Sequence, residues 1–483
     1  MLSPRALRDR LPYKWVVAAV FVAGLFIDIM DTTIVNVALK TMADDLGSDL
    51  ADVEWIVLGY LVSLAVWIPA SGWIGDRFGT KRIFLLALFL FTVASALCGL
   101  ATSLPQLITF RVLQGVGGGM LTPVGTAMLF RAFPPAERAR ASTVLIVPTV
   151  LAPALGPVVG GYLVTEASWR WIFYVNVPVG AAAMVFGWYF LREHREPTAG
   201  RFDVVGFVAS GAGLAMLLFG LSEGAENGWT EPRALGPLVA GLVSFVVLVR
   251  WERRCAEPIL ALRLYGERMF RNANIVLTFT YGSFAGVLFL VPLFLQDYGG
   301  LSALESGLAT FPQALGVMVS SQVAGRLYPI VGPRRLITAG LLVVAAATLP
   351  FLWFDAGTDL WWVRTVMFAR GLGMAFSFVP MQAATYANIT PADTGRASAI
   401  YSTQRQVAAA LGVAGLATIW QMFSRSDGTL GGYHAGFAAG VAVVVLGAVC
   451  AFTLIRDSDA ASTMRRRAAP AAGAAERVAT STG

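Results

Sequence analysis

The chain is divided along its length into uninterrupted apolar runs of about twenty residues, separated by short polar segments. A run of this length crosses the hydrocarbon core of a bilayer as a helix, whereas barrel strands are about half as long and alternate polar with apolar residues. Of the 483 residues, 57% are hydrophobic and 13% are charged, and a soluble domain has about 25% charged residues. We therefore predict an all-α polytopic membrane protein.

Fourteen of these runs are expected to be transmembrane helices. We place them at residues 15–39, 53–74, 83–103, 105–130, 141–165, 171–191, 204–222, 234–251, 273–296, 306–328, 335–354, 361–387, 397–422 and 435–455. Most of the 36 Lys and Arg residues fall in alternate connecting segments, and few fall in the others. Because basic residues collect on the cytoplasmic side, this bias predicts that both termini are cytoplasmic.

Several classes of protein are excluded by the same reading. The net charge of +7 does not indicate nucleic-acid binding, because the basic residues lie in the loops where membrane topology requires them. No loop is long enough for a catalytic domain, and no GxxxxGK[ST] sequence indicates ATP binding. The three cysteines and two histidines form neither a disulfide framework nor a metal-ligand cluster. We expect no enzyme activity, no cofactor and no metal.

An internal repeat divides the chain into two halves. Gly72–Arg82 reads GWIGDRFGTKR, and Gly325–Arg335 reads GRLYPIVGPRR. Nearly the same offset relates ARAS at 139–142 to GRAS at 395–398, and Arg111 to Arg370. Two such halves with a substrate site between them are a transporter architecture.

The repeat sets the predicted organisation. It comprises a cytoplasmic N-terminus (1–14), a first six-helix half (15–191), two inserted helices with flanking loops (192–271), a second six-helix half (272–456) and a disordered cytoplasmic tail (457–483).

Two carboxylates, Asp28 and Asp31, lie inside the first apolar run. Each costs roughly 2.5–3.5 kcal/mol in a bilayer, so such residues usually face a partner or a water-filled pathway. Arg111, in the fourth run, lies at a depth that allows either an Asp28–Arg111 or an Asp31–Arg111 pair. We expect Asp31 to be the principal proton-coupling acid, with Asp28 as its partner or a second site; the alternative is a static ion pair that holds helices together. Glu54 is a third candidate acid, or a solvated carboxylate at a helix start.

Five motifs occur in order on the expected spans. They are DTTIVNVAL (31–39), GWIGDRFGTKR (72–82), RVLQGVGGG (111–119), GPVVGG (156–161) and WRWIFYVNVPVG (169–180). Together they resemble the major facilitator superfamily, and specifically its fourteen-helix drug:proton antiporter family, although Lys40 stands where the family usually has proline. The resemblance covers almost the whole chain.

The resemblance implies a function. It is that of a multi-pass protein of a bacterial cytoplasmic membrane that exports amphipathic drugs, antiseptics or antibiotics by alternating access. The proton gradient would drive it, and its partners would be the small substrate, protons and membrane lipid. It would work as a monomer. A proton symporter or facilitator for a small metabolite, or a lipid-handling transporter, is the alternative, but GPVVGG and the fourteen-span layout favour an exporter.

The resemblance also assigns roles to two motifs. Gly72, Asp76, Arg77, Gly79 and Arg82 would form a latch of the outward-facing state, with Asp76 bonded to Arg77, Arg82 or the N-terminal amides of a neighbouring helix. A charged turn that only fixes topology is the alternative. The second copy of this motif has Pro329 in place of Asp76.

The GPVVGG motif is expected to be a close-packed hinge that discourages proton leak, or else an ordinary helix contact. Its residues are Pro153, Gly156, Pro157, Gly160 and Gly161.

Polar or soft side chains within the spans are candidates for the substrate cavity. They are Asn36, Tyr60, Gln114, Gln296, Gln313, Met381, Arg370 and Arg405. Many such residues instead make helix–helix hydrogen bonds.

Overall fold

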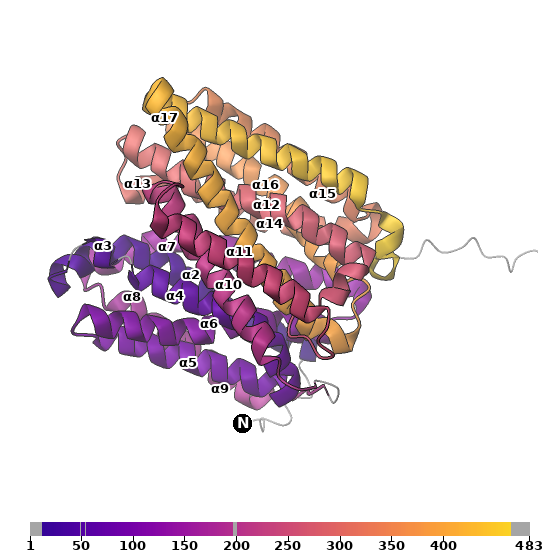
Figure 1. The fold of residues 1–483 in the computed structure, drawn as a ribbon. Coiled ribbons are helices and arrows are strands. Elements are labelled where there is room, and N and C mark those ends of the chain that lie inside the picture. Colours follow the sequence, from indigo (N-terminus) through magenta and orange to yellow (C-terminus); the bar gives the residue numbers. More distant parts are fainter. Residues whose placement is uncertain (1–11, 49, 54, 197–199, 465–483) are drawn as a thin grey trace, which may run out of the picture.

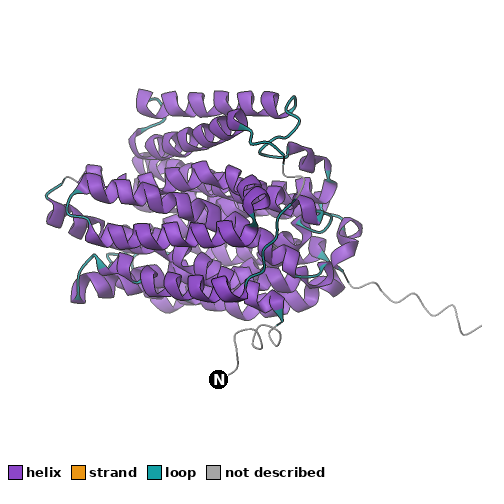
Figure 2. Cartoon of the chain, turned by 90° about the horizontal axis from the view of Figure 1, so that it is seen from below, coloured by secondary structure: helices purple, strands orange, loops and turns teal. Residues whose placement is uncertain are grey.

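The computed structural model describes residues 12–48, 50–53, 55–196 and 200–464, and every regular element in these ranges is a helix (Figure 2). Helices satisfy their backbone hydrogen bonds internally, as an apolar environment requires. The helices of residues 13–190 pack on one side of the molecule and those of residues 268–454 on the other (Figure 1).

The helices of the first group have the following bounds: α2 Tyr13–Leu46, α3 Leu50–Val53, α4 Trp55–Phe78, α5 Thr80–Leu100, α6 Leu104–Ala132, α7 Arg138–Glu166, α8 Trp171–Tyr174 and α9 Asn176–Phe190. The second group comprises α12 Arg268–Leu293, α13 Ala303–Thr310, α14 Pro312–Val331, α15 Pro333–Thr348, α16 Leu360–Thr385 and α17 Thr394–Leu454. Between them in sequence are α10 Val204–Asn227 and α11 Pro232–Glu252, and α10 contacts both α4 and α17.

The expected spans overlap these helices, with three differences in continuity. The sixth span is divided at Val175 into α8 and α9, and the tenth is divided at Phe311 into α13 and α14. Pro312 begins α14, where its missing N–H is tolerated. The last two spans are joined in α17, which is non-helical at Gly428 (φ 79°, ψ 170°), a conformation that favours glycine.

Nine helices of the described ranges are long and apolar enough to cross a membrane, or ten if the bent pair Pro135–Pro153 and Val158–Glu166 is one span. Helices α6, α14 and α16 do not pass this test. They are rich in glycine and polar residues, and much of their length is buried among other helices, so they need less apolar surface of their own.

The start of the expected disordered tail is ordered. Asp457–Thr463 forms a short 3₁₀ helix. The Asp457 carboxylate accepts a hydrogen bond from the Arg334 backbone N–H (2.9 Å), and the Thr463 and Tyr328 hydroxyls are 2.6 Å apart. These contacts hold residues 457–463 against the second group, so the prediction is wrong there; residues 465–483 lie outside the described ranges.

Close backbone contact joins α12 to α17. Gly282 of α12 and Gly412 of α17 face each other so closely that a Cβ on Gly412 would overlap the Gly282 backbone. Small residues at such positions allow helices to approach and gain dispersion energy along their length.

We predict that Gly412→Leu destabilises the protein, because its side chain would force α12 and α17 apart. Overpacking of this kind costs roughly 1–3 kcal/mol or more. Gly415 lies on the same helix, and a Cβ on Gly415 would have no neighbouring atom within 4 Å, so Gly415→Leu is the matched control. Thermal unfolding in detergent should show a lower melting temperature for Gly412→Leu only. Equal melting temperatures for the two variants would contradict this account.

Candidate functional site

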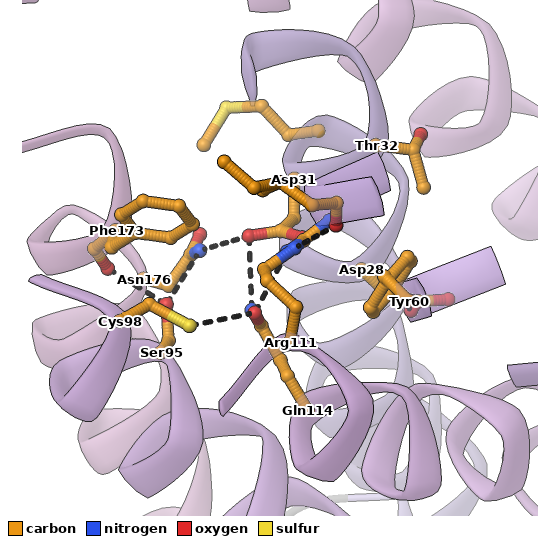
Figure 3. Close-up of polar contacts among 12 residues, drawn as sticks. Asp28, Asp31, Thr32, Tyr60, Ser95, Cys98, Arg111, Gln114, Phe173 and Asn176 are labelled. Atoms are coloured by element: carbon orange, nitrogen blue, oxygen red, sulfur yellow. Dashed lines mark hydrogen bonds and ion pairs between the residues drawn. The ribbon is translucent and has the colours of Figure 1, made fainter. Parts of the chain in front are cut away.

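Asp31 of α2 and Arg111 of α6 form an ion pair in which both side chains are fully buried (Figure 3). Depth along the two spans allowed either acid as the partner of Arg111, and the structure selects Asp31. Gln114 donates from Nε2 to Asp31 Oδ1 at 2.9 Å, and Asn176 donates from Nδ2 to the same oxygen at 3.0 Å. The carboxylate therefore receives three donors, which offsets much of the cost of its burial.

Arg111 is fixed by further contacts. Its Nε donates to the Ile56 carbonyl oxygen (3.0 Å), and its Nη1 donates to the Gln114 side-chain oxygen (2.8 Å). The guanidinium carbon lies 4.2 Å from the centre of the Tyr60 ring, a cation–π arrangement. Because Arg111 and Gln114 are three residues apart on α6, both reach Asp31 from one helix face.

Asn176 and Ser95 belong to this network but are absent from the expected site. Asn176, the first residue of α9, donates to both Asp31 and the Ser95 hydroxyl (3.1 Å), and Ser95 donates to the Phe173 carbonyl oxygen (2.9 Å). The only available signal was the asparagine within WRWIFYVNVPVG. A polar residue in an apolar run is a candidate for interhelical bonding, but it does not identify its partner.

Asp28 has different partners from Asp31. The Tyr60 hydroxyl donates to its Oδ1 at 2.6 Å, and the Thr122 hydroxyl donates to its Oδ2 at 3.3 Å. The Tyr60 hydroxyl thus bonds Asp28 while the Tyr60 ring faces Arg111. The two acids are coupled through one aromatic side chain and do not share the arginine. Glu54, the third candidate acid, lies outside the described residues.

The loop motif joins the two groups of helices. Asp76 Oδ1 lies 2.7 Å from Arg131 Nη2 of α6, and Arg131 Nε donates to the Pro391 carbonyl oxygen at 3.1 Å. Gly72 packs against the backbone of Gly395, where a Cβ on Gly72 would lie 2.7 Å from the carbonyl oxygen. The end of α4 therefore rests on the start of α17.

Two of the expected partners of Asp76, Arg77 and Arg82, were wrong, whereas the carboxylate does lie against Gly395 in the first turn of α17. Arg77 is exposed, and Arg82 lies 3.5 Å from Glu193. The cause is helical geometry: Arg77 follows Asp76 directly and so faces about 100° away on the helix. Arg131, from the far end of α6, fills the position instead.

A carboxylate from elsewhere in the chain contacts the loop motif in each half: Glu193 in the first half and Asp457 in the second. Gly79 and Gly332, which are equivalent positions of the sequence repeat, both have positive φ (106° and 89°), a conformation that favours glycine. The backbone N–H of Lys81, two residues after Gly79, donates a hydrogen bond to the Glu193 carboxylate (3.0 Å). The backbone N–H of Arg334, two residues after Gly332, donates one to the Asp457 carboxylate (2.9 Å). Each half thus stabilises the start of its third long helix with a carboxylate.

The GPVVGG motif packs α7 against α2. Gly156 is in contact with Thr33, and a Cβ on Gly160 would lie 2.8 Å from the Ile34 side chain. Pro153 lines a cavity described below, whereas Gly161 has no neighbour within 4 Å of a Cβ position. Pro157 lies within α7. The close contact lies two to three residues beyond Asp31 on α2.

A cavity of about 350 Å³ separates the two groups of helices. Its walls come from α2, α7, α12, α13 and α14, together with residues that follow α12. The lining residues are Thr33, Asn36, Val37, Val150, Pro153, Phe284, Leu288, Pro292, Gln296, Ser306, Gly307, Thr310, Gln313 and Ala314.

Three of the expected cavity residues line this space, namely Asn36, Gln296 and Gln313. The other five lie elsewhere: Tyr60 and Gln114 are in the acid networks, Met381 is buried in the core, Arg370 is buried beside Gln313, and Arg405 lies half-buried 5.9 Å from the Tyr281 ring. Polarity within a span could not separate residues that bond other helices from those that face the cavity.

The cavity and the loop motif lie toward opposite ends of the molecule. The lining segments are the later part of α2 and the start of α14, whereas the loop motif lies at the end of α4 and the start of α5. The loop-motif end is closed by Asp76, Arg131 and the Gly72–Gly395 contact. The loop-motif end is therefore closed where α4, α6 and α17 meet. A second hollow of about 380 Å³ lies at this end between α7 and α14 and is lined by Ala139, Arg140 and Gly325.

Comparison with known proteins identifies relatives over most of the chain. Residues 21–413 match the profile of the Major Facilitator Superfamily. The "Multidrug resistance protein B homolog" of Mycobacterium tuberculosis (strain ATCC 25618 / H37Rv) is 36% identical over 390 residues, which are 80% of this chain and 72% of the relative. The "Multidrug export protein EmrB" of Escherichia coli (strain K12) is 32% identical over 401 residues, 82% and 78% of the two chains.

A solved structure shares the fold. The human organic anion transporter MFSD10 superposes with a TM-score of 0.65 over 91% of this chain and all of that protein, at 18% identity. At this identity the likeness concerns the fold alone.

We predict that the loop-motif end opens more readily when Asp76 loses its charge. Removing the charge of Asp76 should weaken the contact with Arg131 by roughly 1.5–3 kcal/mol, which shifts the balance between closed and open ends about tenfold or more. Ala139, buried at this end of α7 beside Tyr328, reports the opening when replaced by cysteine in a background without the three native cysteines. Asp76→Asn should raise the rate at which Ala139→Cys reacts with a maleimide and abolish transport, while the protein still inserts.

The control is Arg77→Gln, which removes an exposed charge next to Asp76 and should leave the labelling rate unchanged. An unchanged rate in Asp76→Asn as well, or normal transport by that variant, would rule out the latch.

Proposed function

We propose that this chain, which belongs to the major facilitator superfamily, is a proton-coupled transporter that exports amphipathic drug-like compounds by alternating access. Relatives at 36% and 32% identity are named for multidrug resistance and multidrug export. The protein is a multi-pass protein of the bacterial cell membrane, as its relatives and helical architecture indicate.

The Asp31–Arg111 pair is the observation that carries the proposal. Both groups are buried, and the carboxylate is held by donors from α6 and α9. Protonation of Asp31 would remove its attraction to Arg111 and convert an acceptor into a donor, so Gln114 and Asn176 would have to rearrange. Breaking a buried pair costs roughly 3–5 kcal/mol, and a proton gradient supplies about 2.3 kcal/mol per 100 mV. The two energies are of the same order.

A path from Asp31 to the cavity runs along α2. Thr33 and Asn36, which follow Asp31 on this helix, line the cavity, and Gly156 of α7 packs on Thr33. A shift of α2 caused by protonation would therefore move one wall of the cavity and its contact with α7. The close packing at Gly156 and Gly160 would keep water, and hence protons, out of this seam.

The proposal includes a membrane topology for the chain. We infer fourteen crossings with both termini in the cytoplasm, two six-helix halves at 15–191 and 272–456, and an inserted segment at 192–271. The distribution of Lys and Arg supports this arrangement. The closed loop-motif end would then be cytoplasmic and the cavity would open outward, as in the state from which an exporter releases its substrate.

We further infer that the proton gradient alone drives transport, without ATP, a cofactor or a metal. The protein would work as a monomer in contact with membrane lipid, since each chain contains both halves and the cavity between them.

Asp31→Asn provides the test. The asparagine keeps the size of the side chain but cannot take up a proton, so substrate-dependent proton movement should fall by about tenfold or more. Everted vesicles with a pH-sensitive acridine dye measure this movement, with a substrate chosen by resistance profiling of overexpressing cells. Substrate counterflow, which needs no net proton movement, should persist.

Asp28→Asn is the matched variant, because Asp28 is also buried but bonds Tyr60 rather than Arg111; its effect should be smaller. Loss of counterflow together with proton movement in Asp31→Asn would favour a static ion pair. Proton-driven export at the wild-type rate would refute the coupling role.

A further inference from the structure

Arg370 of α16 is fully buried and lacks an ion-pair partner among the described residues. Its Nη1 donates to the Gln313 side-chain oxygen at 2.7 Å, whereas its Nε and Nη2 have no hydrogen-bond partner within the described ranges. A buried charge is normally paired, and an unpaired one is costly. The Arg370 guanidinium therefore has two donors that could bind a further acceptor. Arg138, which is also buried, likewise has two unpartnered nitrogens, so the argument depends on where Arg370 lies.

The repeat sharpens this contrast. Arg111 and Arg370 occupy corresponding positions in the two halves, and both are fully buried. Arg111 has Asp31, supplied by the first long helix of its half. The corresponding helix, α12, contains no Asp or Glu within its span. The second half thus keeps the cation and lacks the carboxylate.

Arg370 lies directly behind the wall of the cavity. Gln313, its hydrogen-bond partner, lines that cavity. Arginine can only donate, so the Gln313 oxygen must face Arg370 and the Nε2 amide is left as the free end. That Nε2 donates to no residue in the described part of the chain. Ser306, which lines the same cavity and is 1% exposed, also has an Oγ that no described residue hydrogen-bonds. Two unused polar groups therefore accompany the buried charge.

The described part of the cavity wall has no charge that would cancel that of Arg370. The described residues that line the cavity include no Asp, Glu, Lys or Arg. Asp31 is neutralised by Arg111, and Asp28 is bonded by Tyr60 and Thr122. Val37, Phe284 and Leu288 supply apolar surface in the same space. A cation behind polar donors, beside apolar walls, is complementary to an apolar molecule with an anionic group.

We propose that Arg370 and Gln313 form an anion subsite of the cavity, and that the exported compounds include amphipathic organic anions such as carboxylates or sulfonates. That these compounds are exported rests on the proposed function. The subsite itself concerns binding alone. Gln313 donates a hydrogen bond to the anionic group. The positive charge of Arg370 attracts that group from behind Gln313, or Arg370 contacts it directly when the Gln313 amide moves aside.

The test compares two probes that differ in one anionic group: 8-anilinonaphthalene-1-sulfonate and its uncharged parent, N-phenyl-1-naphthylamine. Equilibrium dialysis against protein in nanodiscs, with empty nanodiscs subtracted, gives the two dissociation constants without any proton gradient. We expect the wild type to bind the sulfonate about tenfold more tightly or better than the parent amine.

Three variants examine the charge itself. Arg370→Met removes it and should abolish the preference. Gln313→Glu keeps Arg370 but gives it a carboxylate partner, so the preference should also be lost even if Arg370→Met fails to fold. Arg370→Lys should retain part of it. The matched control is Arg364→Met, which removes a half-exposed cation from the same helix and should change nothing.

Equal affinity for the two probes, no saturable binding of the sulfonate, or an unchanged preference in Gln313→Glu would overturn the subsite. Displacement of the sulfonate probe by sodium sulfate at constant ionic strength would assign the site to a free inorganic anion and overturn the assignment to substrate. Because dialysis needs no transport, these failures are distinct from loss of proton-driven export, which would count against the proposed function alone.

Discussion

The burial of the Asp31–Arg111 pair constrains five helices of the first half of the molecule. A carboxylate and a guanidinium can stay away from water only if both are nearly saturated with partners. Their partners come from α2, α4, α6 and α9, and Ser95 of α5 joins through Asn176. Five helices are thus held in one arrangement by one charge pair. On the proposed function, a change in the protonation of Asp31 would affect all five helices at once.

The second half repeats the backbone of the first but not its chemistry. Gly79 and Gly332 both have positive φ. Two residues after each glycine, a backbone N–H donates a hydrogen bond to a carboxylate. The acid of the pair and the acid of the loop motif are absent from the second copy, where α12 has no carboxylate and Pro329 replaces Asp76. On the proposed function, the acid that takes up the proton and the acid that holds the loop-motif end closed would both belong to the first half. The second half contributes an uncompensated cation beside the cavity.

Features that depend on a single segment of the chain, or on depth within the membrane, could be predicted from the sequence. Runs of apolar residues predicted the helices, the repeat predicted the two halves, and depth placed Arg111 level with the two acids. Features that depend on which helices are neighbours were missed. Arg131 reaches Asp76 from another helix, and Glu193 and Asp457 come from segments that follow the last helix of each half. Periodicity gives the face of a helix, but the partner of that face is set by packing.

The inserted helices add a mechanical constraint to any exchange between states. Helix α10 contacts α4 of the first half and α17 of the second, so it covers one seam between them (Figure 1). Its contact with the first half is apolar, with the rings of Trp55 and Phe219 stacked at 5.9 Å. Just after α10, Trp229 donates a hydrogen bond to Thr418 of α17 at 2.8 Å. Apolar surfaces can slide at little cost, whereas a directional bond must be kept or broken. When the halves rock, α10 would therefore follow α17 and slide along α4.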